Sequence, residues 1–207
     1  MKKFAKIVSG FMALALTLVI AGCSGGNADI SKANVCNAFD KYGAQKIDEF
    51  DDFKYIIGNR TIEAEGGYYY TSKAEDELDL MVKNVMFRLQ DIPDWDAKEC
   101  TCFVATSKDE GSMNFSYILI LGNESDATAV FNYLSEDMSY DDNYTSGNAS
   151  GVNYAVSHEE DSKETIEGVY QQGNSVFWTK AYASEAKGLK GYEKIITDSG
   201  LVSPLSK

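Results

Sequence analysis

The stretch from Ser112 to Gly122 reads SMNFSYILILG and is the clearest signal of fold in the chain. Its first half alternates polar and apolar residues, a period of two that is typical of a β-strand. Its second half, residues 118–121, is apolar at successive positions, so both faces of this strand are expected to be buried. The sequence therefore predicts a central strand of a sheet, ended by the glycine.

The flanking segments predict the remaining elements. Runs rich in β-branched and aromatic residues indicate strands at 68–71, 100–106, 152–156, 165–171 and 176–182. Apolar residues at helical spacing indicate helices at about 31–43, 73–89, 125–138 and 184–200, with Ser31, Ser72, Ser125 and Ser184 as expected caps. The segment 47–57 fits either a strand or irregular turns. The polar segment 139–151 reads as a loop.

Strands grouped as hairpins, with helices between them, are typical of an α+β domain. We expect a largely antiparallel sheet with helices packed on one face, because parallel strands would need a crossover at each step. A strands-then-helix pattern occurs near 100–138 and again near 152–199, which is a weak repeat. The expected core residues are Phe39, Leu78, Val82, Val85, Tyr117, Leu119, Phe131, Leu134, Trp178 and Ile195.

The first 23 residues differ in character from the rest. Lys2, Lys3 and Lys6 precede an almost uncharged apolar run, which ends in Ile20-Ala21-Gly22-Cys23. A positive head, a short apolar run and small residues indicate a secretory signal. The run has about 15 residues, and roughly 20 are needed to span a bilayer. The segment resembles the signal and lipobox of bacterial lipoproteins, with an unprocessed transmembrane helix as the alternative.

This resemblance implies that the chain is cut before Cys23 and that its thiol carries a lipid with fatty acyl chains such as palmitate. The expected parts are a signal peptide at 1–22, a lipidated tether at 23–30 and a single α+β domain at 31–207. Two acyl chains hold a protein stably at a membrane. We therefore expect the extracytoplasmic face of the cell membrane, with the membrane as a partner through Cys23. A tether of six free residues reaches only about 15 Å as a coil.

The charge balance disfavours one class of partner. The chain has 32 acidic and 19 basic residues, a net charge of −13. Removing residues 1–22, which carry three lysines and no acid, leaves 16 basic residues and a net charge of −16. Because phosphate backbones need basic partners, no nucleic-acid binding is expected. The acidity fits a soluble surface, and a cationic ligand or partner is the alternative.

The catalytic inventory of the sequence is small. The one histidine, His158, lies in an acidic segment, 157–163, that reads as a solvated turn. The chain has no Gly-x-Ser-x-Gly elbow and no glycine-rich phosphate loop, and the acidic run 136–143 lacks the spacing of an EF-hand. We therefore expect no catalytic residue, no metal site and no cofactor. A glycosidase that uses two carboxylates stays open, because sequence does not show their separation.

Aromatic residues offer a second alternative. The chain has 13 tyrosines, three of them consecutive at 68–70, and two tryptophans. These rings could line a groove for sugars or peptides, or they could pack in the core and at interfaces. Trp95 lies in a loop-like context, whereas Trp178 lies in the middle of a predicted strand, where core packing is expected.

Three cysteines remain once Cys23 carries lipid. A metal site would need more ligands, and a thioredoxin-like pair needs Cys-x-x-Cys. Outside the cytoplasm disulfides persist, so we predict that Cys36 pairs with Cys102, with Cys100 as the close alternative and three reduced thiols as another. A bond between Cys100 and Cys102 is disfavoured, because their Cβ atoms would lie about 6–7 Å apart in a strand.

The sequence therefore predicts a membrane-anchored extracytoplasmic lipoprotein domain with a non-enzymatic binding or accessory role toward a protein or glycan partner. The lipobox and the small catalytic inventory support this hypothesis. The alternative is a carboxylate-based hydrolase that acts on envelope or environmental glycans. Two carboxylates roughly 5–10 Å apart in a deep cleft would favour the hydrolase, and a shallow aromatic or acidic face would favour binding.

Overall fold

The computed structural model describes residues 30–59, 66–84, 96–107, 111–141, 143–160 and 164–205. Its elements are α1 (Lys32–Tyr42), β1 (Gln45–Lys46), α2 (Phe50–Asn59), β2 (Tyr68–Ser72), α3 (Glu75–Asn84), β3 (Ala97–Ser107), β4 (Ser112–Leu121), α4 (Glu124–Met138), β5 (Thr145–Ala149), β6 (Val152–Glu160), β7 (Glu164–Gln172), β8 (Ser175–Ala183), the 3₁₀ helix η2 (Ala186–Leu189) and α5 (Lys190–Asp198). The described strands form one sheet in the order β1-β2-β3-β4-β8-β7-β6-β5. Among the described strands, β1 and β2 pair in parallel and all other neighbours are antiparallel.

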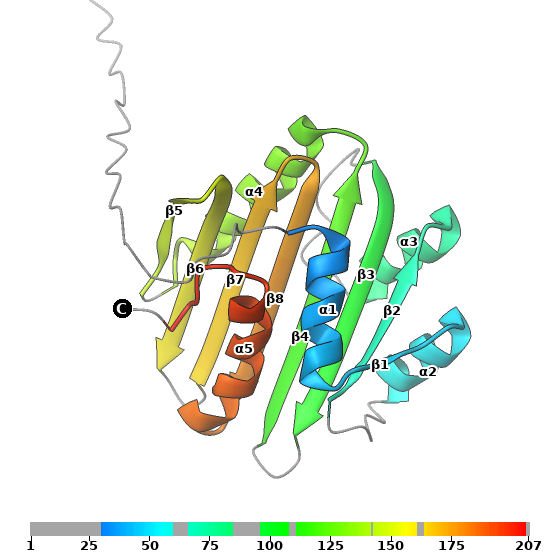
Figure 1. The fold of residues 1–207 in the computed structure, drawn as a ribbon, viewed down its shortest axis with the longest axis horizontal. Helices are drawn as coiled ribbons and strands as arrows, with labels where there is room; N and C mark the ends of the chain where they lie inside the picture. The colour runs from blue at the N-terminus through cyan, green and yellow to red at the C-terminus, as the bar shows by residue number, and fades with distance from the viewer. Residues whose placement is uncertain are drawn as a thin grey trace, which may run out of the picture.

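Helices cover both faces of this sheet (Figure 1). The front face, which carries α1, η2 and α5, buries one apolar cluster, and the back face, which carries α2, α3 and α4, buries a second one. The α+β class and the largely antiparallel sheet are confirmed. The expectation that helices pack on one face is wrong, because the central strands present apolar side chains on both sides.

Strand β4 shows the cause directly. It lies between β3 and β8 in the middle of the sheet, as the sequence predicted. Leu119 and Leu121 point into the back cluster, whereas Ile118 and Ile120 point into the front cluster. Because alternate side chains of a strand point to opposite faces, a run that is apolar at every position needs cover on both.

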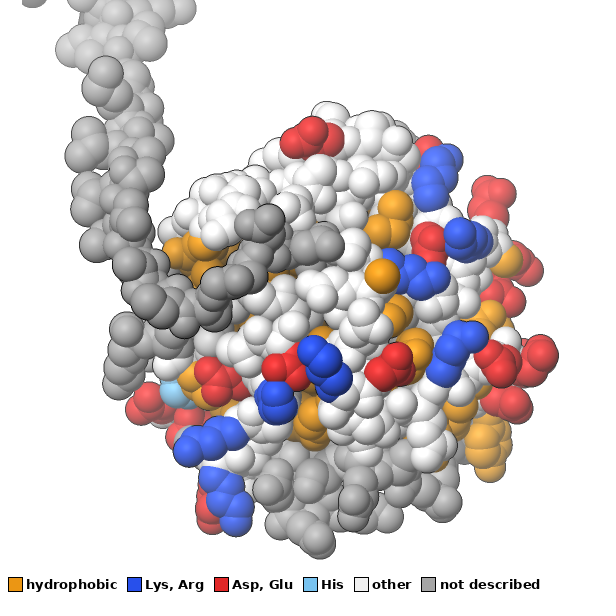
Figure 2. All heavy atoms as spheres, viewed as in Figure 1, with side chains coloured by type: hydrophobic (Ala, Val, Ile, Leu, Met, Phe, Trp, Pro, Cys, Tyr) orange, Lys and Arg blue, Asp and Glu red, His pale blue; other side chains and the backbone are white. Residues whose placement is uncertain are grey.

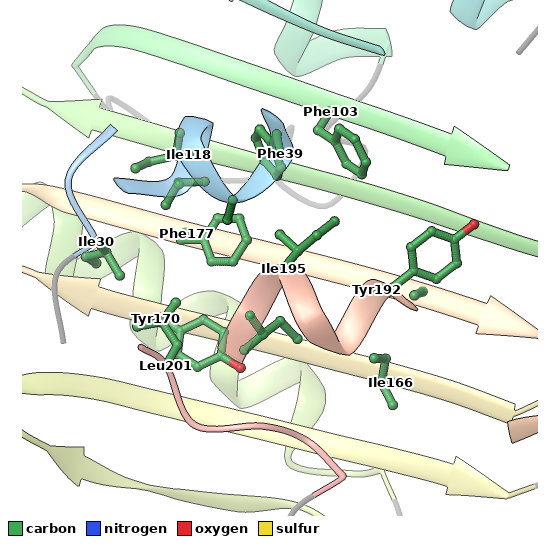
Figure 3. Close-up of a cluster of buried hydrophobic side chains, with 14 of the residues drawn as sticks. Ile30, Phe39, Phe103, Ile118, Ile166, Tyr170, Phe177, Tyr192, Ile195 and Leu201 are labelled. Atoms are coloured by element: carbon green, nitrogen blue, oxygen red, sulfur yellow. The ribbon is translucent and has the colours of Figure 1, made fainter. Parts of the chain in front are cut away.

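The front cluster is rich in aromatic rings. Phe39 of α1 stacks on Phe103 of β3, with ring centroids 4.5 Å apart and planes 9° from parallel. Figure 3 shows Ile195 of α5 near Phe177 of β8, and Tyr192 of the same helix lies further along the sheet in the same cluster. An aromatic pair of this kind is worth about 0.5–1.5 kcal/mol beyond its buried area, so ring packing helps to fix α1 on the sheet.

Helix ends follow local chemistry, although not always at the expected residue. Ser31 caps α1 by accepting a hydrogen bond from the Asn34 backbone N–H, and Gly43 ends this helix at φ 96°, both as predicted. Asn123, not Ser125, caps α4, because its side-chain oxygen accepts from the Asp126 N–H at 2.9 Å. Two further expected caps differ: Ser72 lies in β2, and Ser184 precedes η2, which has no side-chain cap.

Several elements were not predicted or were predicted too short. The segment without a firm prediction forms α2, and the predicted loop 139–151 contains β5. Strand β5 is an exposed edge strand, so its side chains carry no alternating apolar pattern. The predicted acidic turn begins later than expected, because β6 continues to Glu160.

Most of the expected core is confirmed. Phe131 of α4 is only half-buried, the side chain of Val82 and all of Val85 lie outside the described residues, and the other expected residues are buried: Phe39, Leu78, Tyr117, Leu119, Leu134, Trp178 and Ile195. The strands-then-helix order recurs as β3-β4-α4 and β6-β7-β8-η2-α5, but α4 and α5 lie on opposite faces. Among the described helices, none has the length and apolar character required to span a bilayer.

Candidate functional site

A row of polar side chains crosses three strands of the back face. Ser157 of β6 lies opposite Glu167 of β7, which lies opposite Lys180 of β8. Trp178 Nε1 donates a hydrogen bond to Glu167 Oε1 at 2.8 Å, and Lys180 Nζ donates to Glu167 Oε2 at 2.6 Å. The Glu167 side chain is only 1% exposed, so this carboxylate lies inside the sheet packing.

Two donors compensate for the burial of this charge. A buried carboxylate is costly unless it is paired and hydrogen-bonded, and each Glu167 oxygen accepts a hydrogen bond from one of these two side chains. Trp178 is fixed in turn by stacking on Tyr117, with ring centroids 5.0 Å apart. The carboxylate therefore holds the Lys180 ammonium in one place, while the Lys180 side chain stays 31% exposed.

Two further carboxylates lie beside this pair. Asp141 follows the C-terminal end of α4, and its Oδ2 accepts a hydrogen bond from Ser157 Oγ at 2.9 Å. Burial, followed by the nearby Asp141 carboxylate, raises the pKa of Glu159, and the Lys180 charge opposes this rise. We call Asp141, Ser157, Glu159, Glu167 and Lys180 the back-face row.

The row lies away from the start of the described domain. Ile30 is fully buried, and its backbone N–H donates to the side chain of Gln172 at the end of β7. Glu167 precedes Gln172 by five residues, which is about 16 Å at the rise of a strand. Half-buried Phe115 of β4 lies opposite Lys180 in the strand register, on the side of β8 away from Glu167.

This arrangement suits the binding of polar groups. The fixed Lys180 ammonium can contact an anionic or hydroxyl-bearing group, and the Asp141 and Glu159 carboxylates can contact a cationic one. Because both Glu167 oxygens already have donors, Glu167 positions Lys180 in this structure.

Sequence reasoning missed this row, although one signal pointed to it. The predicted strands 165–171 and 176–182 are separated by a short segment that fits a hairpin turn, and the register of this hairpin is fixed by the Gln172–Ser175 pair. Continuing that register along the two strands places Glu167 opposite Lys180. An acid and a lysine at mirrored positions of a predicted hairpin were therefore a readable pair.

The predicted disulfide between Cys36 and Cys102 is not present, and this prediction is corrected. Cys36, Cys100 and Cys102 are free thiols in the structure. Cys36 lies on α1 against the front cluster, whereas Cys102 points into the back cluster, so the sheet separates the two sulfur atoms. The prediction placed the covering helix on the wrong face of β3.

Other singled-out residues have structural roles. His158 lies within β6 rather than in a turn, is 13% exposed, and has Nε2 2.9 Å from Glu164 Oε2. The Tyr69 hydroxyl donates to Asp40 and the Tyr70 hydroxyl to Glu77, each at 2.8 Å. These rings are buried, as is Trp178, so they pack instead of lining a groove. Cys23 and Trp95 lie outside the described residues.

A shallow hollow lies on the front face beside β5. Its empty volume, open solvent included, is about 230 Å³, and its lining comprises Ala149, Ser150, Val152, Tyr154, Tyr170, Gly200, Leu201 and Val202. None of these side chains is a carboxylate. In the described ranges, no group of three or more His, Cys, Asp or Glu residues is placed to hold a metal ion.

Charges on the front face are mixed. Figure 2 shows lysine and acidic side chains interspersed over α1 and α5, with acidic side chains gathered along the edge that carries α2 and α3. The first turns of these two helices contribute Asp51 and Asp52, and Glu75, Asp76 and Glu77.

No protein-family model and no curated protein sequence matches the chain.

Proposed function

We propose that this protein is a lipid-anchored accessory domain at the extracytoplasmic face of the cell membrane, which binds a protein or glycan partner through the back-face row. The lipobox-like Ile20-Ala21-Gly22-Cys23 supports the anchor. The observation that carries the binding role is the Lys180 side chain, which is 31% exposed while its ammonium group is held by the buried Glu167 carboxylate.

The position of the row fits a tethered protein. Only residues 24–29 separate Cys23 from the buried Ile30, a reach of about 15 Å for a flexible coil. The Ile30 end of the sheet would therefore stay close to the bilayer. The back-face row lies further along the strands, where a partner could approach.

The anchor is tested by Cys23→Ser. The variant should lose fatty-acid label and leave the membrane fraction, because two acyl chains supply most of the membrane affinity. A variant that still carries label and remains in the membrane would contradict the anchor.

The binding role is tested in cells with a photo-reactive residue at Thr165, which is half-exposed on the back face beside the row. The control position is Ser125, which is exposed in the first turn of α4. This end of α4 lies near the end of β4, where Asn174 of the β7–β8 turn donates a hydrogen bond to the Leu121 carbonyl. Adducts should form from Thr165, weaken strongly with Lys180→Ala, and be weaker from Ser125. Equal adducts from both positions, or no effect of Lys180→Ala, would exclude the row as the binding site.

One observation keeps the hydrolase as a second candidate. Glu159 has a raised pKa beside a second carboxylate, which is a feature of a general acid in glycoside hydrolysis. Purified protein should then release sugars from envelope glycans, and Glu159→Gln should abolish that release. Turnover with this dependence would replace the binding proposal.

A further inference from the structure

The Cys100-Thr101-Cys102 segment places two thiols side by side in strand β3. Both side chains point into the back cluster, and both residues are 0% exposed. Their Sγ atoms lie 3.6 Å apart, which is van der Waals contact for sulfur. Leu119 and Met81 belong to the same cluster, so the pair is enclosed by apolar side chains.

We infer that Cys100 and Cys102 are a redox pair, whose oxidation to an intrastrand disulfide is coupled to the opening of β3 from the sheet. The sulfur atoms already touch and need only about 1.5 Å of further approach to reach a bond length of about 2.05 Å. The backbone is the obstacle. Residues two apart in a strand have Cβ atoms about 6–7 Å apart, against about 3.5–4.5 Å in a disulfide.

Strand β3 cannot contract locally without losing neighbours on both sides. Cys100 pairs with Ser72 of β2 and with Leu119 of β4, and Cys102 pairs with Tyr70 and Tyr117 on the same two strands. Among the described residues, only the two-residue strand β1 continues the sheet beyond β2. Detachment of β1 and β2 therefore frees one side of β3, and the bond closes with loss of the local pairings to Leu119 and Tyr117 of β4 on the other side.

The chemistry balances with a low-molecular-weight disulfide, such as oxidised glutathione, as the oxidant. One cysteine thiolate attacks the glutathione disulfide, forms a mixed disulfide and expels one glutathione thiolate. The second cysteine thiolate then attacks the mixed disulfide and expels the other. Two protons and two electrons leave the cysteine pair, and the oxidant becomes two thiols. Cys36 cannot replace either partner, because it lies on the front face.

Burial makes access the slow step. Thiols at 0% exposure meet glutathione only when the sheet opens locally. In the closed state, packing protects the dithiol and the strand pairings oppose the disulfide. Once formed, the disulfide holds β3 contracted and stabilises the opened arrangement. Disulfide formation thus makes a transient opening of the sheet at β3 persist until a reductant cleaves the bond.

The test uses the full chain, purified from membranes in detergent and reduced beforehand. It is exposed to excess oxidised glutathione in urea concentrations below the unfolding transition, then alkylated and mapped by mass spectrometry. The Cys100–Cys102 disulfide should form slowly without urea and about fivefold or more faster per molar of urea, since opening exposes surface. The oxidised protein should have a Tm about 4 °C or more below the reduced one, reversed by reductant.

Two variants serve as matched controls. Cys36→Ser should leave the rate and the Tm shift unchanged. Cys102→Ser should stop at a glutathione adduct on Cys100, with the same urea dependence, which separates access from bond formation. No intrastrand disulfide even in urea, a rate independent of urea, a bond to Cys36, or an oxidised form as stable as the reduced one would each overturn the inference.

Discussion

The front and back faces of the sheet both bury apolar clusters, but they enclose different polar groups. The front face buries neutral groups: Ser116 Oγ lies 2.9 Å from Asn114 Oδ1 and 2.8 Å from Thr179 Oγ1, and Asn114 Nδ2 donates to Thr179 Oγ1 at 3.0 Å. The back face buries the Glu167 carboxylate and the cysteine pair. The most deeply buried carboxylate and the cysteine pair thus lie on the same face, which is where we propose function.

The largest expected effects test whether the apolar cores of the two faces are equal. Leu119→Ala removes back-face packing and Ile118→Ala removes front-face packing at adjacent residues of β4, 0% and 1% exposed. Each should lower the free energy of unfolding by about 2–5 kcal/mol, the usual cost of such a cavity. Denaturant titration measures both, and a loss below about 1 kcal/mol at either position would mean that its face is not packed as described.

A smaller effect tests the charge on the back face. Glu167→Ala leaves the Trp178 N–H buried without its acceptor and should cost about 1–3 kcal/mol. Glu167→Gln keeps a side-chain oxygen for Trp178 and should cost less. Ser157→Ala, in the same row, is the control for loss of a hydroxyl. Equal losses for the Ala and Gln variants would show that the carboxylate charge, not the acceptor, supplies the stability.

The sequence predicted the apolar core of the sheet far better than it predicted the back-face row. Residues 118–121 are apolar at every position, and this local pattern suffices to identify a central strand. The back-face row joins residues from three strands and from the end of α4, so it depends on strand order and register. Cys102 illustrates the same limit: the pattern identified its strand, but the face to which it points depends on which helices pack there.

Glu99 gives the front face its own paired carboxylate, at the start of α1. Burial alone would raise the pKa of Glu99, but hydrogen bonds and charges from Lys32 and Lys73 outweigh burial and lower it. Because the pKa is lower in the folded state, the stabilisation is present above about pH 4.5, the ordinary value, and is lost as the pH falls through the lowered pKa.

Glu99→Gln should therefore cost about 1 kcal/mol or less at pH 7, since Lys73 is largely exposed and such pairs are screened. The difference from the unchanged protein should shrink below pH 4.5. Thermal unfolding from pH 3 to pH 7 measures it, with Glu185→Gln, an exposed residue before η2, as the control. A difference that stays constant with pH would rule out the ion pairs as its source.

Glu159 should give the opposite sign on the back face, with the smallest effect of the four. Its pKa is raised in the folded state by burial and by Asp141, so the folded protein binds this proton more tightly than the unfolded chain. Stability is then full below the ordinary value of 4.5 and falls as the pH rises through the raised pKa. Glu159→Gln removes the repulsion and should raise the Tm slightly at pH 7, and this gain should vanish near pH 4. The same thermal series measures it, and a Glu159→Gln protein that is less stable at pH 7 would show that the carboxylate is attracted to Lys180 more than it is repelled by Asp141.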